Sequence, residues 1–155
     1  MTVYLSLGTN LGDRQRQLSR ALAELEARLG VGPERVSATL ETPAWGFEGP
    51  DFLNQVVCFE LGKPWTPTRL LDACQRTERR LGRQGRPEWD ETGRRIYHDR
   101  PIDIDILFWG TRRIRTTRLE IPHPLMAQRD FVMIPLREIA DAQIMRAFPE
   151  IFAPK

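Results

Sequence analysis

The sequence predicts a single α+β domain over residues 1–155, with strands and helices in the order β-α-β-β-α-β. Short runs in which apolar and polar residues alternate indicate strands, and two longer segments with apolar residues at helical spacing indicate helices. Turn residues, mainly Gly and Pro, separate these segments. This order is typical of a ferredoxin-like core, an antiparallel sheet flanked by helices, to which the C-terminal residues add a hairpin and short helices.

The first half of this core begins with a strand at residues 3–7, where apolar side chains recur at every second position. Asn10 or Asp13 can cap the helix that follows, because either side chain can accept a hydrogen bond from a free backbone N–H group. Leucines at helical spacing predict this helix over residues 18–29, and Gly30 ends it.

The second half contains two further strands, predicted at residues 36–41 and 52–61. The loop between them, residues 42–50, is rich in Pro, Gly and Trp. A second helix begins near Pro67 and ends at Gly82.

The rest of the chain opens with residues 82–100, which show no periodicity and are long for a loop, so we expect a functional, disordered or lid segment. A strand at residues 102–108, a hairpin at 114–121 and a short helix at 131–140 follow. The tail beyond Asp141 carries little signal.

Composition excludes several classes of protein. Hydrophobic residues make up 41% and charged residues 28%, as in a globular protein, and no apolar run approaches the ~18 residues of a membrane span. A net charge of +2 is too small to indicate general binding to nucleic acid. We therefore expect a cytoplasmic protein, with Cys58 and Cys74 as buried thiols rather than a disulfide or a zinc site.

Arginine supplies 21 of the 23 cationic side chains, and eight of these arginines lie between Arg76 and Arg100. The planar guanidinium group binds phosphate oxygens with two parallel hydrogen bonds, which a lysine cannot do. A phosphate-rich substrate fits this bias, and genomic composition or heat adaptation would explain it equally well.

The most informative motif is the acidic pair Asp103 and Asp105, which alternates with isoleucines at 102, 104 and 106. A period of two places both carboxylates on one face of a strand, about 7 Å apart, with the isoleucines on the other face. The two carboxylates repel each other unless a cation lies between them, and oxygen ligands suit Mg2+ bound with a phosphorylated substrate. A solvated strand face without any ion is the alternative.

Familiar phosphate-binding and catalytic motifs are absent: the chain has neither GxxxxGK[ST] nor GxGxxG, no zinc-ligand spacing around its two histidines and no nucleophile elbow. The turn that begins at Gly8 can hold an anion at the start of a helix, or it is a plain turn. His123 can donate to a phosphate or make a structural hydrogen bond. Four aromatic side chains can stack on a flat heterocycle or pack a lid: Trp45, Phe47, Phe52 and Phe131.

Eight short motifs occur in order along most of the chain: Gly8-Thr-Asn-Leu-Gly12, Thr42-Pro43, Phe52-Leu-Asn54, Gln75-Arg-Thr-Glu78, Arg83, Arg100-Pro-Ile-Asp-Ile-Asp105, Pro122-His123 and Arg129-Asp-Phe131. Together they resemble 6-hydroxymethyl-7,8-dihydropterin pyrophosphokinase, the folate-pathway family that moves diphosphate from ATP to a pterin alcohol.

The resemblance implies that Asp103 and Asp105 hold two Mg2+ ions, which bridge the ATP phosphates and the pterin hydroxyl. It implies that Arg83 and Arg100 bind the triphosphate and stabilise charge during transfer. The ATP-binding residues that it implies are Gln75, Glu78, Arg83, Arg100, Ile106, Arg118, His123 and Arg129. The pterin-binding residues that it implies are Thr42, Pro43, Trp45, Asn54 and Phe131.

Two lid loops are also implied, at about residues 43–52 and 83–100. The second loop is longer than the family pattern, so that Trp89 or Tyr97 could take the place of its usual tryptophan. The residues before the acidic pair, and Pro124 after His123, also depart from the pattern.

We expect a monomer that binds two small molecules, and neither nucleic acid nor a membrane. Two rival functions remain open. A nucleotidyltransferase would also use paired carboxylates and metal ions, but it would release pyrophosphate where the diphosphotransferase releases AMP. An RNA-binding module would need exposed aromatic residues on the central strands, where the acidic pair has the wrong charge.

Overall fold

The computed structural model describes residues 1–44, 49–82, 88–89, 91–92, 95–96 and 101–153. Its elements, in chain order, are β1 (Thr2–Thr9), α1 (Arg14–Leu29), β2 (Arg35–Val36), β3 (Leu40–Thr42), β4 (Phe52–Glu60), α2 (Pro67–Arg80), β5 (Glu88–Trp89), β6 (Arg95–Ile96), β7 (Asp103–Trp109), β8 (Ile114–Arg115), β9 (Glu120–Ile121), the 3-10 turn η1 (Met126–Gln128), α3 (Asp130–Ile139), α4 (Ala142–Ala147) and α5 (Pro149–Phe152).

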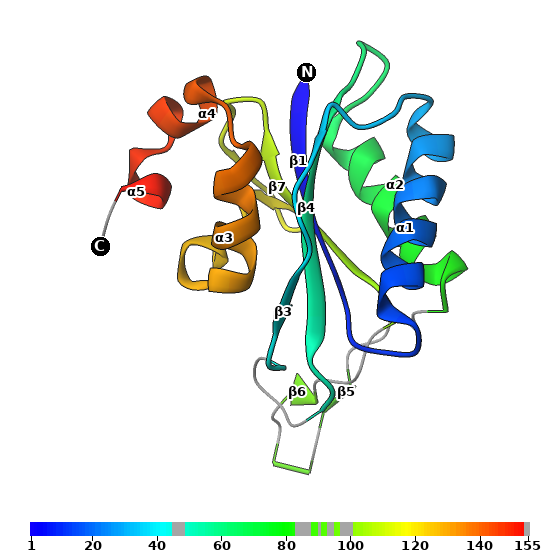
Figure 1. The fold of residues 1–155 in the computed structure, drawn as a ribbon. Helices are drawn as coiled ribbons and strands as arrows, with labels where there is room; N and C mark the ends of the chain where they lie inside the picture. The colour runs from blue at the N-terminus through cyan, green and yellow to red at the C-terminus, as the bar shows by residue number, and fades with distance from the viewer. Residues whose placement is uncertain (45–48, 83–87, 90, 93–94, 97–100, 154–155) are drawn as a thin grey trace.

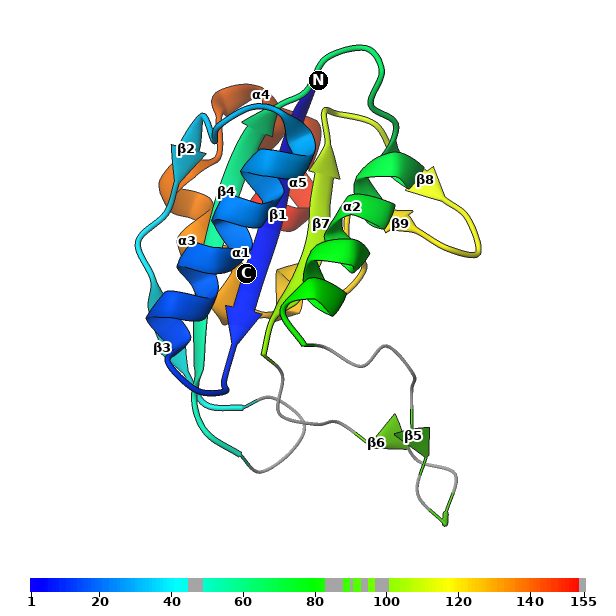
Figure 2. The same ribbon diagram turned by 90° about the vertical axis from the view of Figure 1, so that its right-hand side faces the viewer.

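An antiparallel sheet separates two layers of helices (Figure 1). The strand order is β2-β4-β1-β7, with β3 also paired to β4, so the central strand β1 lies between β4 and β7. Helices α1 and α2 cover one face, and α3, α4 and α5 lie on the other face (Figures 1 and 2). This arrangement confirms the predicted ferredoxin-like α+β fold. No helix in the described part of the chain is long and apolar enough to cross a membrane.

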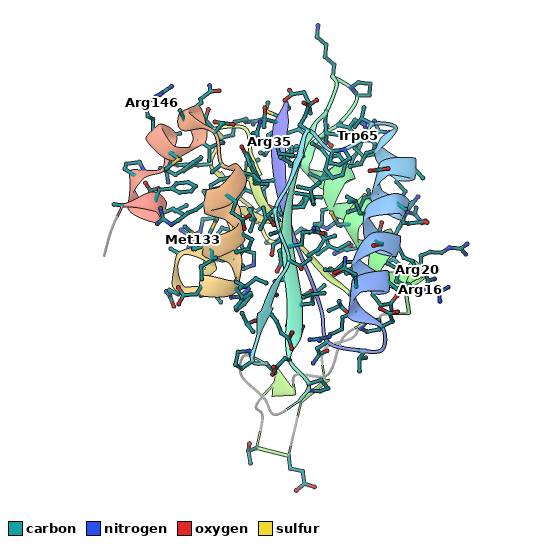
Figure 3. The ribbon with its side chains drawn as sticks, viewed as in Figure 1. Arg16, Arg20, Arg35, Trp65, Met133 and Arg146 are labelled. Carbon is teal, nitrogen blue, oxygen red and sulfur yellow. The ribbon has the colours of Figure 1, made fainter. Side chains whose placement is uncertain are left out.

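The ends of α1 follow from the local sequence. Asp13 is the residue that caps the helix, since its side chain accepts a hydrogen bond from Arg16 N at 3.1 Å. The buried Asn10 instead donates to the carbonyl of Pro50. Gly30 ends the helix with φ of 75°, a conformation that favours glycine. Figure 3 shows Arg16 projecting away from the sheet, on the charged outer side of the helix.

One predicted strand differs in the structure, and two segments with little sequence signal contain short elements. The strand expected at residues 36–41 is divided into β2 and β3, because Ser37 accepts a hydrogen bond from Val56 N through its hydroxyl group and interrupts regular pairing. Within residues 82–100, which show no periodicity, β5 and β6 form a short antiparallel pair. The weakly patterned tail forms α4 and α5, in agreement with the short C-terminal helices predicted, and it buries Ile144 of α4 and Phe148, which lies between the two helices.

The isoleucine alternation around the acidic pair is confirmed. Ile104 and Ile106 are buried in the core beneath α1 and α2. After Ile106 the pairing of β7 with β1 shifts by one residue, so that Leu107 and Phe108 both lie in the hydrophobic cluster under α3. The strand therefore changes from a half-polar to a fully buried segment, and this explains why its sequence loses the period of two.

The two cysteines are free and buried, as expected. Cys58 lies in the cluster under α3 and Cys74 in the cluster under α1 and α2. The cluster under α3 contains packed aromatic rings: Phe108 stacks on Phe148 with ring centroids 5.0 Å apart, and Tyr4 meets Phe108 edge-on at 5.8 Å.

A polar network attaches the C-terminal helices to the sheet. The hydroxyl of the buried Tyr4 donates to Asp141 Oδ2 at 2.9 Å and accepts from Arg35 Nη2 at 2.8 Å. Arg35 Nε also donates to the carbonyl of Ile139, where α3 ends. These bonds place Arg35 at the end of the sheet away from the acidic pair (Figure 3).

We predict that Tyr4→Phe lowers the free energy of unfolding by about 1–3 kcal/mol, because a buried donor and acceptor then lose their partner. Urea unfolding followed by circular dichroism would measure the change. Ser19→Ala, which removes an exposed hydroxyl group from α1, is the control and should change stability by less than about 0.5 kcal/mol. Equal stability of the Phe variant and the parent chain would contradict the role of the network.

Candidate active site

The sheet is polar at the end where β1 finishes and β7 begins, on the face that carries α3. This is the lower end of the sheet in Figure 1. Gly8 of β1 pairs with Asp103 of β7 on one side and with Asn54 of β4 on the other. Ser6 pairs in the same way with Asp105 and Val56. Since directly paired residues point to the same face of a sheet, both carboxylates lie beside short side chains, and an amide lies across from Asp103.

Gly8 leaves a strip without a side chain between Asp103 and Asn54. A Cβ atom at this position would lie 3.2 Å from Asn54 Oδ1 and 3.6 Å from Phe52 Cδ1. The Asn54 side chain is held in place, since its Nδ2 donates to Thr42 Oγ1 at 2.9 Å and to the carbonyl of Leu40 at 3.1 Å. The Asn54 amide oxygen therefore faces the strip over Gly8 and can accept a hydrogen bond from a ligand.

Asp105 has a histidine and an arginine beside it. His123 Nε2 is 3.9 Å from Asp105 Oδ1, and Arg129 Nη1 is 4.0 Å from Asp105 Oδ2. Burial lowers the pKa of His123, and the charge of Arg129 lowers it further against the opposing charges of Asp103 and Glu120. His123 Nδ1 accepts a hydrogen bond from Leu125 N, so the neutral imidazole presents an Nε2–H donor toward Asp105.

Phe131 completes this side of the site. It is half-buried at the start of α3, and the guanidinium carbon of Arg129 lies 5.6 Å from the centroid of its ring. Phe52, which the implied pterin set lacks, lies near Gly8 and belongs to the same neighbourhood. Its place two residues before Asn54 on one strand could have indicated this, because positions i and i+2 share a face.

The other implied ATP residues lie on the α2 side of β7. Arg118 on the β8–β9 connection pairs with Asp72 of α2 at 2.9 Å, and this pairing holds the pKa of Asp72 below its usual value. Gln75 is half-buried on α2. Ile106 is only 4% exposed, so its side chain is mainly a core residue. Figure 2 shows α2 and the β8–β9 hairpin next to each other beside β7.

Glu78, another of the implied ATP-binding residues, lies in the last turn of α2. Its side chain is buried, and Oε2 accepts a hydrogen bond from Ile104 N at 2.9 Å. Burial raises the pKa of the nearby Cys74 thiol, and the charges of Glu78 and Asp105 raise it further. The structure therefore places Glu78 behind the acidic strand rather than on an open surface.

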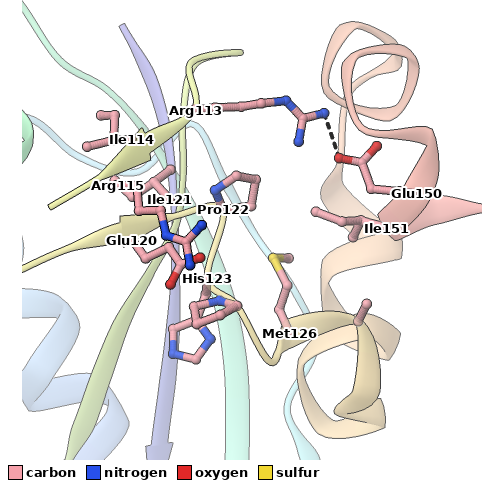
Figure 4. A pocket seen from close by; sticks show the side chains of 12 residues that line it. Arg113, Ile114, Arg115, Glu120, Ile121, Pro122, His123, Met126, Glu150 and Ile151 are labelled. Carbon is pink, nitrogen blue, oxygen red and sulfur yellow. Dashed lines mark ion pairs between the residues drawn. The ribbon is translucent and has the colours of Figure 1, made fainter.

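A groove of about 460 Å³ lies on the far side of His123, between the β8–β9 hairpin, the segment from Pro122 to Ala127, and α5 (Figure 4). An ion pair of 2.5 Å between Arg113 and Glu150 crosses its rim. His123 borders both this groove and Asp105, so the groove adjoins the acidic site.

Several candidate residues lie outside the described residues: Arg83, Arg100, Trp45, Phe47 and Tyr97, as does the side chain of Trp89. Thr42 contacts Asn54, and Pro43 is exposed at the end of β3. The structure thus brings together Asp103, Asp105, His123, Arg129 and the Asn54 strip, and places Gln75 and Arg118 beyond the edge of β7.

The acidic pair fits a hard divalent cation that a substrate helps to hold. Within the described residues, no group of three or more His, Cys, Asp or Glu side chains could hold a metal ion by itself. Two carboxylates leave most positions around a magnesium ion for water and phosphate oxygens, as is usual for Mg2+ bound together with a nucleotide.

An acidic pair on a ferredoxin-like sheet, with the cation Arg129 at its margin and the Asn54 amide across from it, fits a phosphate-transferring enzyme. Comparison with known proteins identifies the family. The model of the 7,8-dihydro-6-hydroxymethylpterin-pyrophosphokinase (HPPK) family matches residues 4–141, and the chain belongs to this family. It is therefore an enzyme, an ATP-dependent diphosphotransferase.

Curated relatives support the same assignment. A protein of Porphyromonas gingivalis is 46% identical over 140 residues, which cover 89% of this chain and 90% of the relative. A protein of Aquifex aeolicus is 40% identical over 139 residues, covering 89% and 79%, and one of Bacillus subtilis is 37% identical over 137 residues, covering 88% and 76%. All three are named 2-amino-4-hydroxy-6-hydroxymethyldihydropteridine pyrophosphokinase.

We predict that His123 titrates below pH 6.5 in the ligand-free protein, because burial and Arg129 disfavour the imidazolium form. Proton NMR of the imidazole Cε1–H would give the midpoint, and a His98→Gln variant would assign the signal, since the chain has only two histidines. A midpoint above 6.5 would show that the carboxylates outweigh burial.

Proposed function

We propose that this chain transfers the diphosphate group of ATP to the hydroxymethyl group of 6-hydroxymethyl-7,8-dihydropterin, giving AMP and the pterin diphosphate for folate biosynthesis. The observation that carries the proposal is the row Asp103–Gly8–Asn54 across three paired strands. A flat ligand over Gly8 that hydrogen-bonds to Asn54 would lie next to the carboxylates at which the nucleotide phosphates are activated. The family assignment supports the same pair of substrates.

The acidic pair is the proposed magnesium site. Asp103 and Asp105 would hold two Mg2+ ions through their carboxylate oxygens. Bound there, the ions would neutralise phosphate charge and lower the pKa of the attacking hydroxyl group.

Residues around the pair bind and orient the triphosphate. Arg129 supplies a fixed positive charge, and the neutral His123 supplies an Nε2–H donor near Asp105. Arg83 and Arg100 are proposed on the resemblance alone as further triphosphate ligands. Gln75 and Arg118 would meet the nucleoside end on the α2 side of β7, with Ile106 offering only its small exposed surface.

The pterin would lie over Gly8. The Asn54 amide oxygen can accept a hydrogen bond from an N–H group at the edge of the heterocycle, and its orientation is fixed by the bond to Thr42. Phe52 and Phe131 are the described aromatic side chains placed to contact the ring. Pro43 and Trp45 are proposed as further pterin-binding residues on the resemblance alone.

The reaction needs positioning more than covalent work by the protein. The pterin hydroxyl oxygen forms a bond to the β-phosphorus as the bond from that phosphorus to the oxygen bridging to the α-phosphorus breaks, and the hydroxyl proton passes to solvent. AMP leaves with the bridging oxygen. We propose no essential protein base, and we propose that loops 43–52 and 83–100 exclude water, which would otherwise hydrolyse ATP.

The proposal treats residues 1–155 as one catalytic domain that acts as a monomer in the cytoplasm. Its direct test is product analysis: the chain is incubated with ATP, Mg2+ and the pterin alcohol, and nucleotides are separated by ion exchange. AMP in equal amount to pterin diphosphate is expected. Release of pyrophosphate would indicate the rival nucleotidyltransferase.

We predict that Asp103→Asn or Asp105→Asn lowers kcat at least about 100-fold, because a metal ion contributes several kcal/mol to stabilising the transition state. Steady-state AMP formation at saturating MgATP measures the loss. Glu26→Gln, which removes a negative charge from α1, should leave kcat within about twofold. Normal turnover of a variant that carries both asparagines would rule out the acidic pair as the metal site.

We predict that Gly8→Ala raises the KM for the pterin about tenfold or more, because the added methyl group occupies the strip and presses on Asn54. Affinity for an ATP analogue should stay unchanged. Gly32→Ala is a matched control, since a Cβ there meets nothing within 4 Å and its φ lies in the ordinary region. An unchanged pterin KM in the Gly8 variant would place the pterin elsewhere.

A further inference from the structure

Glu78 is an acidic residue at an unfavourable position. It lies in the last turn of α2, where the helix dipole disfavours negative charge, and its side chain belongs to the buried face of that helix with Cys74 and Thr77. A buried carboxylate costs free energy unless hydrogen bonds compensate for lost hydration. A glutamate at this position is therefore poorly explained by helix stability.

One contact of Glu78 is with the acidic strand. Glu78 Oε2 accepts a hydrogen bond from Ile104 N at 2.9 Å. Because Ile104 N donates to Glu78, this N–H group points away from β1, which is the one strand that pairs with β7 among the strands that the structure describes. In a wider sheet, the carbonyl group of a neighbouring strand would accept this hydrogen bond. Here the Glu78 carboxylate accepts it instead, at the residue between Asp103 and Asp105.

This bond fixes the backbone from which both carboxylates project. The side chain of Ile104 packs into the core beneath α1 and α2, and its neighbours in the sequence project to the opposite face. A hydrogen bond at residue 104 limits the twist and fraying of an edge strand at this point. The directions of the two carboxylates are therefore coupled to the position of α2.

We propose that Glu78 is a positioning residue, which holds β7 through Ile104 N and so sets the two aspartates at the separation and orientation that a divalent cation requires. This inference rests on the proposed function. It differs from the role in ATP binding that the resemblance implied, because the Glu78 side chain is 6% exposed and one carboxylate oxygen is engaged by the backbone of β7.

Two conservative variants distinguish the effect of the length of the Glu78 side chain from the effect of its negative charge. Glu78→Gln keeps the length of the side chain and an oxygen that can accept from Ile104 N, but it removes the negative charge. Glu78→Asp keeps the charge but is one methylene shorter, so it cannot reach Ile104 N without movement of α2. Glu24→Gln and Glu24→Asp, on the outer side of α1, are matched controls.

Three measurements apply to each variant: hydrogen exchange of the Ile104 amide in the protein alone, calorimetric binding of Mn2+ with a non-hydrolysable ATP analogue, and kcat. For Glu78→Asp we expect amide exchange about tenfold faster or more and Mn2+ binding about tenfold weaker, with a lower kcat. Binding of the analogue without metal should remain within about twofold. Glu78→Gln should stay within about threefold of the parent chain in every measurement.

The opposite order would overturn the inference. If Glu78→Gln is more impaired than Glu78→Asp, the charge acts directly on metal or nucleotide and the bond to Ile104 is incidental. Unchanged exchange at Ile104 in Glu78→Asp would equally exclude positioning through this amide. Failure of the proposed function is a separate result: the parent chain would then form no AMP, whereas exchange and Mn2+ binding would still test Glu78.

Discussion

The position of β1 between β4 and β7 is the constraint on which the site depends. Because β1 pairs with both strands, Gly8 sets Asn54 and Asp103 opposite each other on one face, and Ser6 does the same for Val56 and Asp105. Gly8 has no side chain and Ser6 has a short one, so β1 places little bulk between these groups. Backbone pairing therefore holds the Asn54 amide, which can recognise a ligand, across from the Asp103 carboxylate. Paired strands hold such groups more rigidly than a loop would.

The charge distribution of the site depends on which side chains lie on each side of β7. On the α3 face, Arg129 and His123 lie beside Asp105, and burial keeps the pKa of His123 low. On the α2 side, Glu78 holds the backbone at Ile104. Negative charge is thus concentrated along one edge strand, with a fixed cation at its margin, which favours a substrate that arrives as a metal–phosphate complex.

Much of the fold could be predicted from periodicity, because the buried faces of α1, β4 and α2 leave regular patterns in the sequence. The period of two around Asp103 also indicated the shared face of the two carboxylates. The division of residues 36–41 into β2 and β3 was not predictable, since it depends on the Ser37 hydroxyl bonding to a distant strand. Nor was the packing of α4 and α5, whose short segments gain stability only from contact with the sheet.

By itself the sequence determined the element order, the acidic pair on a half-buried strand, and through its ordered motifs the family. Only the tertiary structure decided that Gly8 lies directly against the Asn54 amide, and that Glu78 faces the backbone of β7 rather than open solvent. The reason is physical: local patterns record which face of an element is buried, but they do not record which distant residue is paired against it.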